Sequence, residues 1–149
     1  MAVQRWFDCS TEQVFAVLGD GWLYPLWVVG ASRIRDVDDG WPAEGRKLHH
    51  SFGVWPLVID DTTEVIEIQP DRRIVLEARG WPVGKARVEI TVNAAANGSL
   101  VSIAEDVIDG PTQLVPRRVR VAAIDVRNRE TLRRLAYLAE GRADNSATS

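Results

Sequence analysis

The chain has 149 residues, of which 46% are hydrophobic and 26% are charged, and this is the composition of an ordinary globular protein. Its length favours one domain, and a formal net charge of −3 gives no general attraction to nucleic acid or to an anionic membrane. The single cysteine excludes an intrachain disulfide, and we find neither a secretory leader nor an apolar stretch of membrane-spanning length, so a soluble, cytoplasmic protein without stable membrane insertion is expected.

The first 30 residues predict one strand and two short helices. Residues 2–9 are typical of a strand, and Ser10 then offers an N-cap with Gln13 at the spacing of a capping box. Gly19 is suited to end the helix that follows. The aromatic-rich segment 20–27 predicts a second short helical or irregular piece, which Pro25 is expected to break.

Between about residues 32 and 109 the apolar residues alternate with a period of two, which predicts six further strands. We expect these strands at residues 32–38, 46–53, 56–68, 72–78, 84–94 and 99–109. The segments between them are short and rich in turn-forming residues, so they leave no room for helical crossovers. Successive strands are therefore expected to pair as an antiparallel meander.

A long helix is predicted over residues 117–139. One narrow stripe of this helix is apolar and has Asn128 at its middle; its members are Val121, Ile124, Leu132, Leu135 and Ala139. Arginines flank the stripe at positions 120, 127 and 134, and with their i,i+4 acidic neighbours they predict a solvated face rather than a nucleic-acid site. We expect one domain over residues 1–140 and a flexible tail over 141–149.

Four segments carry a likeness to a known family: CSTEQVFAVLGD with YPLWVVG, GWPAEGRKLHHSFGVWP, RGWPVGKARVEI, and EDVIDGP with RNRETLRRLAYLAEG. The sequence resembles the polyketide cyclase/dehydrase and START-like lipid-binding superfamily, particularly its small actinobacterial members. The resemblance implies an α+β, helix-grip fold, in which a curved, seven-stranded antiparallel sheet grips a long C-terminal helix around a hydrophobic cavity. It implies no specific reaction, because the superfamily has no universal catalytic motif.

Glu105 shares its strand phase with Val101, Ile103 and Val107, so its carboxylate is expected on the buried face. Arg5 interrupts the apolar phase of the first strand in the same way. Because the resemblance makes the first and last strands neighbours, we predict an Arg5–Glu105 ion pair inside the cavity, with Asn128 reaching toward it. The alternative is a buried polar network that holds the structure and binds no ligand.

Histidine and tryptophan supply the other candidates. His50 is expected to point inward, either as an acid or base or as a hydrogen-bonded structural residue. Its neighbour His49 points to the opposite face, so the two do not form a metal site together, and no cofactor is expected. Tryptophans are expected either at the pocket mouth or in core packing. The full predicted ligand-binding set is Arg5, Trp27, His50, Phe52, Trp55, Trp81, Glu105 and Asn128.

Three functional hypotheses follow from these patterns. The first is binding or carriage of a hydrophobic, lipid-like or aromatic small molecule, because the implied fold supplies a cavity and the familiar catalytic signatures are absent. The second is a polyketide cyclase or dehydratase that uses Glu105 and His50 as acid and base. The third is an interaction module that forms a homodimer through Val119, Val126 and Tyr137 on the outer side of the long helix.

Overall fold

The structure is a computed structural model that describes residues 2–54, 56–80 and 84–147. One antiparallel sheet forms most of it. The described strands lie in the order β1-β7-β6-β5-β4-β3-β2. Strands β2 to β7 therefore form the predicted meander, and β1 lies at the edge of the sheet beside β7. The strands are β1 (Ala2–Phe7), β2 (Ala31–Val37), β3 (Lys47–Val54), β4 (Leu57–Gln69), β5 (Arg73–Gly80), β6 (Gly84–Ala95) and β7 (Gly98–Asp109). The α+β fold class is confirmed.

Two short helices follow β1, as the sequence predicts. Helix α1 (Thr11–Leu18) begins at the Ser10–Gln13 capping box and ends at Gly19. A 3-10 turn, η1 (Gly21–Leu23), then leads into α2 (Tyr24–Trp27). Pro25 does not break this segment but lies in the first turn of α2, because a backbone without an N–H costs nothing at that position.

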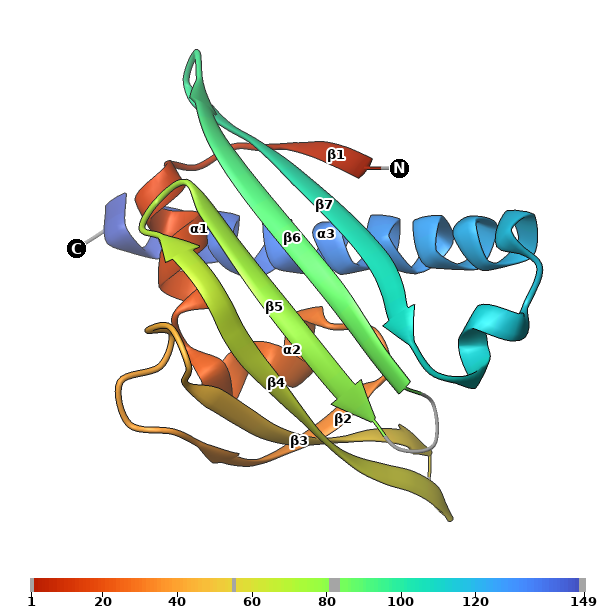
Figure 1. The fold of residues 1–149 in the computed structure, drawn as a ribbon. Coiled ribbons are helices and arrows are strands. Elements are labelled where there is room, and N and C mark those ends of the chain that lie inside the picture. The colour runs from red at the N-terminus through yellow and green to blue at the C-terminus, as the bar shows by residue number, and fades with distance from the viewer. Residues whose placement is uncertain (1, 55, 81–83, 148–149) are drawn as a thin grey trace.

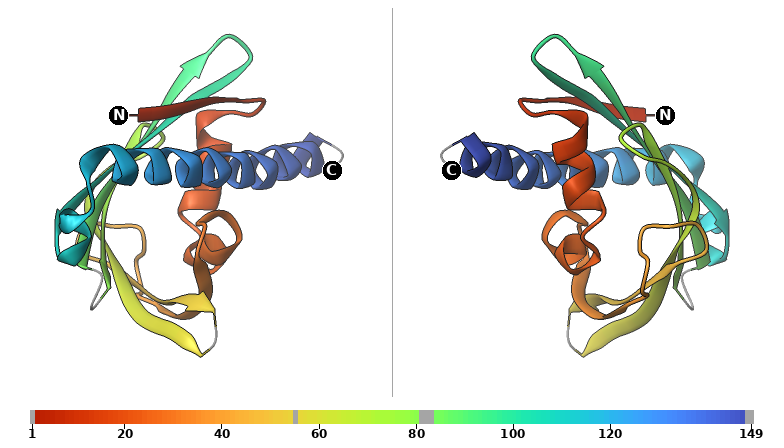
Figure 2. Two further views of the ribbon diagram at one scale, coloured as in Figure 1. Left: turned by 90° about the vertical axis from the view of Figure 1, so that its right-hand side faces the viewer. Right: turned by 90° about the vertical axis from the view of Figure 1, so that its left-hand side faces the viewer.

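The sheet curves around the long helix α3 (Arg117–Ala147), which crosses its concave side (Figures 1 and 2). A second 3-10 turn, η2 (Pro111–Leu114), joins β7 to this helix. The C-terminal half of α3 packs against β1 and α1, where Leu132, Leu135 and Ala139 are buried in the core. The N-terminal half buries less, and this difference leaves a cavity between that half and the sheet.

Helix α3 extends beyond the predicted end at residue 139, because two of its last side chains are anchored to the N-terminal part of the chain. Glu140 accepts a hydrogen bond from the backbone N–H of Asp8 at 2.9 Å, and Arg142 forms an ion pair with Asp20 at 3.4 Å. Residues 141–147, expected to lie in a loose tail, are therefore helical, and residues 148–149 lie outside the described part of the chain.

The outer side of α3 exposes large apolar side chains. Val126 and Tyr137 are 72% and 80% exposed, and Val119, the third position proposed for a homodimer, is 59% exposed but also lines the cavity described below. Accessibility alone does not make an interface. Dimerisation through this face stays a prediction.

Candidate functional site

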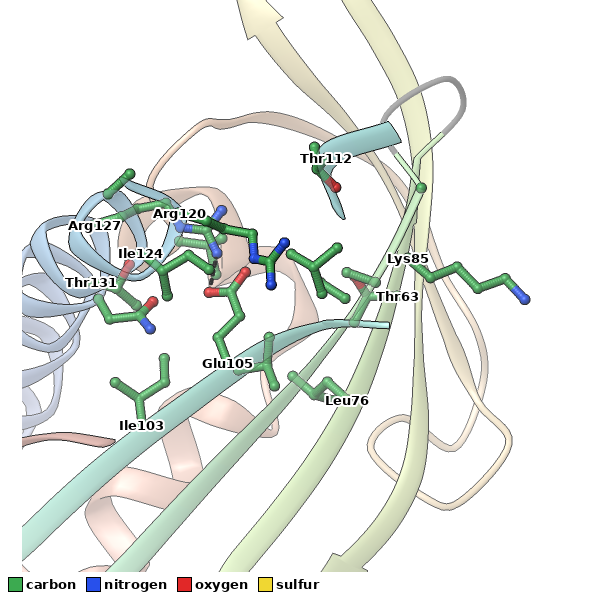
Figure 3. A pocket seen from close by; sticks show the side chains of 18 of the residues that line it. Thr63, Leu76, Lys85, Ile103, Glu105, Thr112, Arg120, Ile124, Arg127 and Thr131 are labelled. Carbon is green, nitrogen blue, oxygen red and sulfur yellow. Dashed lines mark hydrogen bonds and ion pairs between the residues drawn. The ribbon is translucent and has the colours of Figure 1, made fainter. Parts of the chain in front are cut away.

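The cavity has a volume of about 460 Å³ and lies between the concave face of the sheet, α2 and the N-terminal half of α3. Its wall is mostly apolar, and Leu76, Ile103 and Ile124 are among the side chains that face it (Figure 3). These residues come from β5, β7 and α3, so the period-two and helical patterns of the sequence place them there directly. A largely apolar hollow of this size is typical of small-molecule sites.

An ion pair forms the first polar feature of this wall. Glu105 projects from β7 toward α3, where its carboxylate accepts a hydrogen bond from Arg127 (Figure 3). The Glu105 side chain is only 6% exposed, whereas Arg127 is 36% exposed and keeps contact with solvent. Arg120 lies on the same side of the cavity and donates to the backbone carbonyl of Gln113 at 3.2 Å.

A chain of hydrogen bonds forms the second polar feature. Thr63 on β4 contacts the cavity, and its Oγ1 lies 3.3 Å from the Tyr24 hydroxyl and 2.7 Å from His50 Nε2. Tyr24 also stacks on the His50 ring, with centroids 5.0 Å apart. Burial raises the pKa of Tyr24 to about 12 and lowers the pKa of His50 to about 4, so both side chains are neutral at pH 7.

Asp61, two residues before Thr63 on β4, also lines the cavity. Burial raises its pKa to about 6, although the backbone N–H of Thr62 donates to the carboxylate at 2.6 Å and opposes that rise. This carboxyl group can therefore gain or lose a proton close to neutral pH.

Two further polar groups in the wall are buried N–H groups. Trp27 Nε1 on α2 and Asn128 Nδ2 on α3 have no hydrogen-bond partner among the described residues. Trp27 packs edge-on against Tyr24, with ring centroids 5.2 Å apart, and both tryptophan and asparagine line the cavity.

A family model described as "Polyketide cyclase / dehydrase and lipid transport" matches residues 1–140. The chain belongs to this family. This match confirms the family predicted from the resemblance, and the observed architecture confirms the predicted helix-grip fold. A comparison with curated proteins gave no match.

Solved structures with this fold include several bacterial proteins. The di-domain ARO/CYC protein StfQ from the steffimycin biosynthetic pathway has a TM-score of 0.75 and 11% identity, over 97% of this chain and 51% of StfQ. Protein NE0264 from Nitrosomonas europaea has a TM-score of 0.72 and 14% identity, over 97% and 96% of the two chains. Protein CV1439 from Chromobacterium violaceum has a TM-score of 0.70 and 19% identity, over 94% and 96%. At identities this low, the structural likeness shows a shared fold alone.

Two features of the described residues bear on other kinds of site. Within residues 2–54, 56–80 and 84–147, no three histidine, cysteine or carboxylate side chains gather as metal ligands would. None of the helices in the described part of the chain has the length and apolar character needed to cross a membrane.

The predicted Arg5–Glu105 ion pair is wrong. Arg5 pairs across the strands with Val101, four residues from Glu105, and its side chain is exposed on the edge strand β1. The β1–β7 pairing stops at Ala104, so Glu105 lies beyond the end of β1 and takes its partner from the helix instead. Strand phase predicted the direction of Glu105 correctly, but it could not predict the neighbour.

The other predicted site residues divide into three groups. Trp27, Glu105 and Asn128 line the cavity together. His50 is fully buried and does not line it among the described residues, but reaches the wall through Thr63. Trp55, Trp81 and the side chain of Phe52 lie outside the described part of the structure. Ligand binding by any of the predicted set stays a prediction.

Asp61 and Arg127 are two of the cavity residues that sequence reasoning missed. Asp61 shares its strand phase with Ile59 and Thr63, so it interrupts an inward-facing phase in the same way as Glu105, and the same rule would have identified it. Arg127 was assigned to a solvated face because it flanks the apolar stripe. Its long side chain reaches around the helix to Glu105. A helical wheel shows only the direction in which a side chain leaves the helix, so it does not represent this reach.

His50 and Asp61 should give folding a pH dependence of opposite sign. The native pKa of His50 is lowered from 6.5 to about 4, so the free energy of unfolding that it contributes is lost as the pH falls from 6.5 toward 4. The native pKa of Asp61 is raised from its usual value of 3.8 to about 6, so the free energy of unfolding that it contributes is lost as the pH rises through this range. In the wild type the two effects partly cancel.

Asp61→Asn should uncover the effect of His50. We expect the free energy of unfolding of this variant to rise by roughly 2 kcal/mol between pH 4.5 and 6.5, as about 1.4 kcal/mol per unit of pKa shift implies. Urea unfolding at several pH values measures this slope. The matched variant Asp61→Asn with His50→Gln should show a flat profile over the same range, and a flat profile in Asp61→Asn itself would contradict a buried, neutral His50.

Proposed function

We propose that this protein binds and carries a hydrophobic small molecule in the cavity between its sheet and α3. The observation that supports this function is the 460 Å³ hollow itself, in which a mostly apolar wall is interrupted by only a few polar groups. Water in such a hollow is poorly hydrogen-bonded, and a ligand that displaces it buries apolar surface at about 25 cal/mol per Å². Membership in a family of cyclases, dehydrases and lipid transport proteins supports the same class of ligand.

A blocked cavity tests this proposal. Ala86 on β6 lines the cavity, and its neighbour Arg87 points to the other face of the sheet and is exposed. Ala86→Trp should fill part of the hollow and weaken binding of the fluorescent hydrophobic probe Nile red at least about tenfold, whereas Arg87→Trp places the same ring outside and should bind like the wild type. Fluorescence titration measures both affinities. Saturable binding of equal strength in the wild type and both variants would place the probe outside the cavity.

A cyclase- or dehydratase-type enzyme is the second candidate, and the position of Asp61 favours it. Burial leaves this cavity-lining carboxyl group with a pKa of about 6, which is suited to proton transfer near neutral pH. His50 is buried behind Thr63, and Glu105 is paired with Arg127, so Asp61 replaces both as the acid or base of this hypothesis. With a polyketide-like substrate, Asp61→Asn should abolish turnover and retain binding. Binding without turnover in the wild type would leave carriage as the function.

Native mass spectrometry of the protein purified from its own host gives the most direct evidence on carriage. A carried molecule should remain in the cavity during purification and appear as a discrete mass above that of the 16.6 kDa chain. The same preparation from Ala86→Trp should lack the added mass, because the ring occupies the ligand's place.

A further inference from the structure

Two hydrogen-bond donors are buried in the cavity wall without an acceptor. The Trp27 and Asn128 side chains are only 4% and 1% exposed, and neither Trp27 Nε1 nor Asn128 Nδ2 has a partner among the described residues. The two residues belong to α2 and α3, which pack against each other, and both line the same cavity. Both residues therefore lie on the α2–α3 side of the hollow.

Unpartnered buried donors are rare and unfavourable, because each has lost its hydrogen bonds to water without gaining others. The cost is avoidable at these two positions. Phenylalanine, although smaller than Trp27, or leucine, which has as many side-chain heavy atoms as Asn128, would fill the apolar wall and bury no N–H. Asn128 also interrupts the apolar stripe of α3, between Ile124 and Leu132. A ligand group that accepts hydrogen bonds would supply the partner that the described residues do not, and would account for polar side chains at these two positions.

The chemistry of the two donors restricts the group that they can bind. The indole of tryptophan donates only, whereas an amide can turn about its terminal bond and present its NH₂. A carbonyl oxygen has two lone pairs, so it can accept from one donor or from both. Among the described residues that line the cavity, Asp61 and Glu105 oppose Arg120 and Arg127, and the ammonium end of Lys85 points away from the hollow (Figure 3). These described residues therefore do not favour a net charge on the ligand.

We infer that Trp27 and Asn128 form a carbonyl-binding subsite, so that the ligand is a neutral, ring-containing or aliphatic hydrophobe with a ketone, quinone or lactone oxygen at the α2–α3 side. This inference rests on the proposed function, because it requires that the cavity bind a small molecule. The apolar wall holds the body of the ligand, and the two donors select for the oxygen and fix its orientation.

A pair of probes that differ in one carbonyl group tests the subsite. Fluorene and 9-fluorenone share the same planar ring system, and only fluorenone carries the oxygen. Competition against Nile red should show that the wild type binds fluorenone about tenfold more tightly than fluorene, a difference of about 1.4 kcal/mol. Trp27→Phe and Asn128→Leu should each reduce this preference, and the double variant should bind the two probes equally. Ile124→Val, which changes an apolar cavity residue, should weaken both probes alike.

The outcomes separate this inference from the proposed function. If neither probe binds to the wild type, the cavity is not a hydrophobic site, and the proposed function fails. If both bind with equal affinity, or if the double variant keeps the preference for fluorenone, the function stands and the subsite is wrong.

Melting temperature distinguishes a ligand-binding asparagine from a structural one. Asn128 Nδ2 has no hydrogen-bond partner among the described residues, so Asn128→Leu should melt no lower than the ligand-free wild type while it loses the preference for fluorenone. A clear fall in melting temperature, with the preference retained, would assign Asn128 to the framework of the fold.

Discussion

Arg127→Met should lower the free energy of unfolding by about 3 kcal/mol, whereas Glu105→Leu should lower it by about 1 kcal/mol or less. The difference follows from the burial of the two partners. The Glu105 side chain is 6% exposed and the Arg127 side chain is 36% exposed. Loss of the arginine leaves a carboxylate in an apolar cavity without its partner. Loss of the glutamate leaves a guanidinium that can turn toward water on a flexible stem.

The double variant completes the test. With both charges removed, an apolar pair fills the same space, and much of the loss in Arg127→Met should be recovered. Urea unfolding of the wild type, the two single variants and the double variant gives the coupling energy directly. Additive losses, or equal losses in the two single variants, would mean that the ion pair is not formed as the structure has it. Arg134→Met, which removes an arginine that pairs on the surface of α3, serves as the control and should cost less than about 1 kcal/mol.

Local patterns predicted the fold closely because each element depends on neighbouring residues. The alternation of apolar residues predicted the ends of each strand to within about two residues, and the Ser10–Gln13 capping box predicted the start of α1. The end of α3 was missed because its last turns depend on Asp8 and Asp20, which lie more than 120 residues away in the sequence. Such contacts leave no local signal.

Prediction of the site was less complete for a related reason. Strand phase placed Glu105 in the cavity, and the helical wheel placed Asn128 there, since both are properties of one element. The partner of Glu105 depends on where β1 ends relative to β7 and on how far Arg127 reaches. Burial of Trp27 depends on how α2 packs against α3. A phase gives the direction of a side chain, but only the packing of elements gives its neighbours.

Gly84→Ala should be among the most destabilising single substitutions in the sheet, with a loss of more than about 3 kcal/mol in the free energy of unfolding. Gly84 begins β6 with a φ of +112°, a conformation that side chains rarely adopt. An added Cβ would also fall against the backbone of Asp109 and Gly110, which cannot move aside as a flexible side chain can. Both strain and a clash with backbone therefore act at this position.

The same substitution should alter the cavity, because Gly84 lines it and Gly110 leads directly into η2, whose Thr112 also lines it. Gly45→Ala is the matched control. Gly45 has a φ of +80°, but an added Cβ there meets no atom within 4 Å, so this variant isolates backbone strain and should cost about 1 kcal/mol with unchanged binding of Nile red. Urea unfolding and the probe titration are measured on both variants. Equal losses in the two would show that strain alone acts at Gly84, and that the close approach of β6 to the end of β7 does not hold the cavity wall in place.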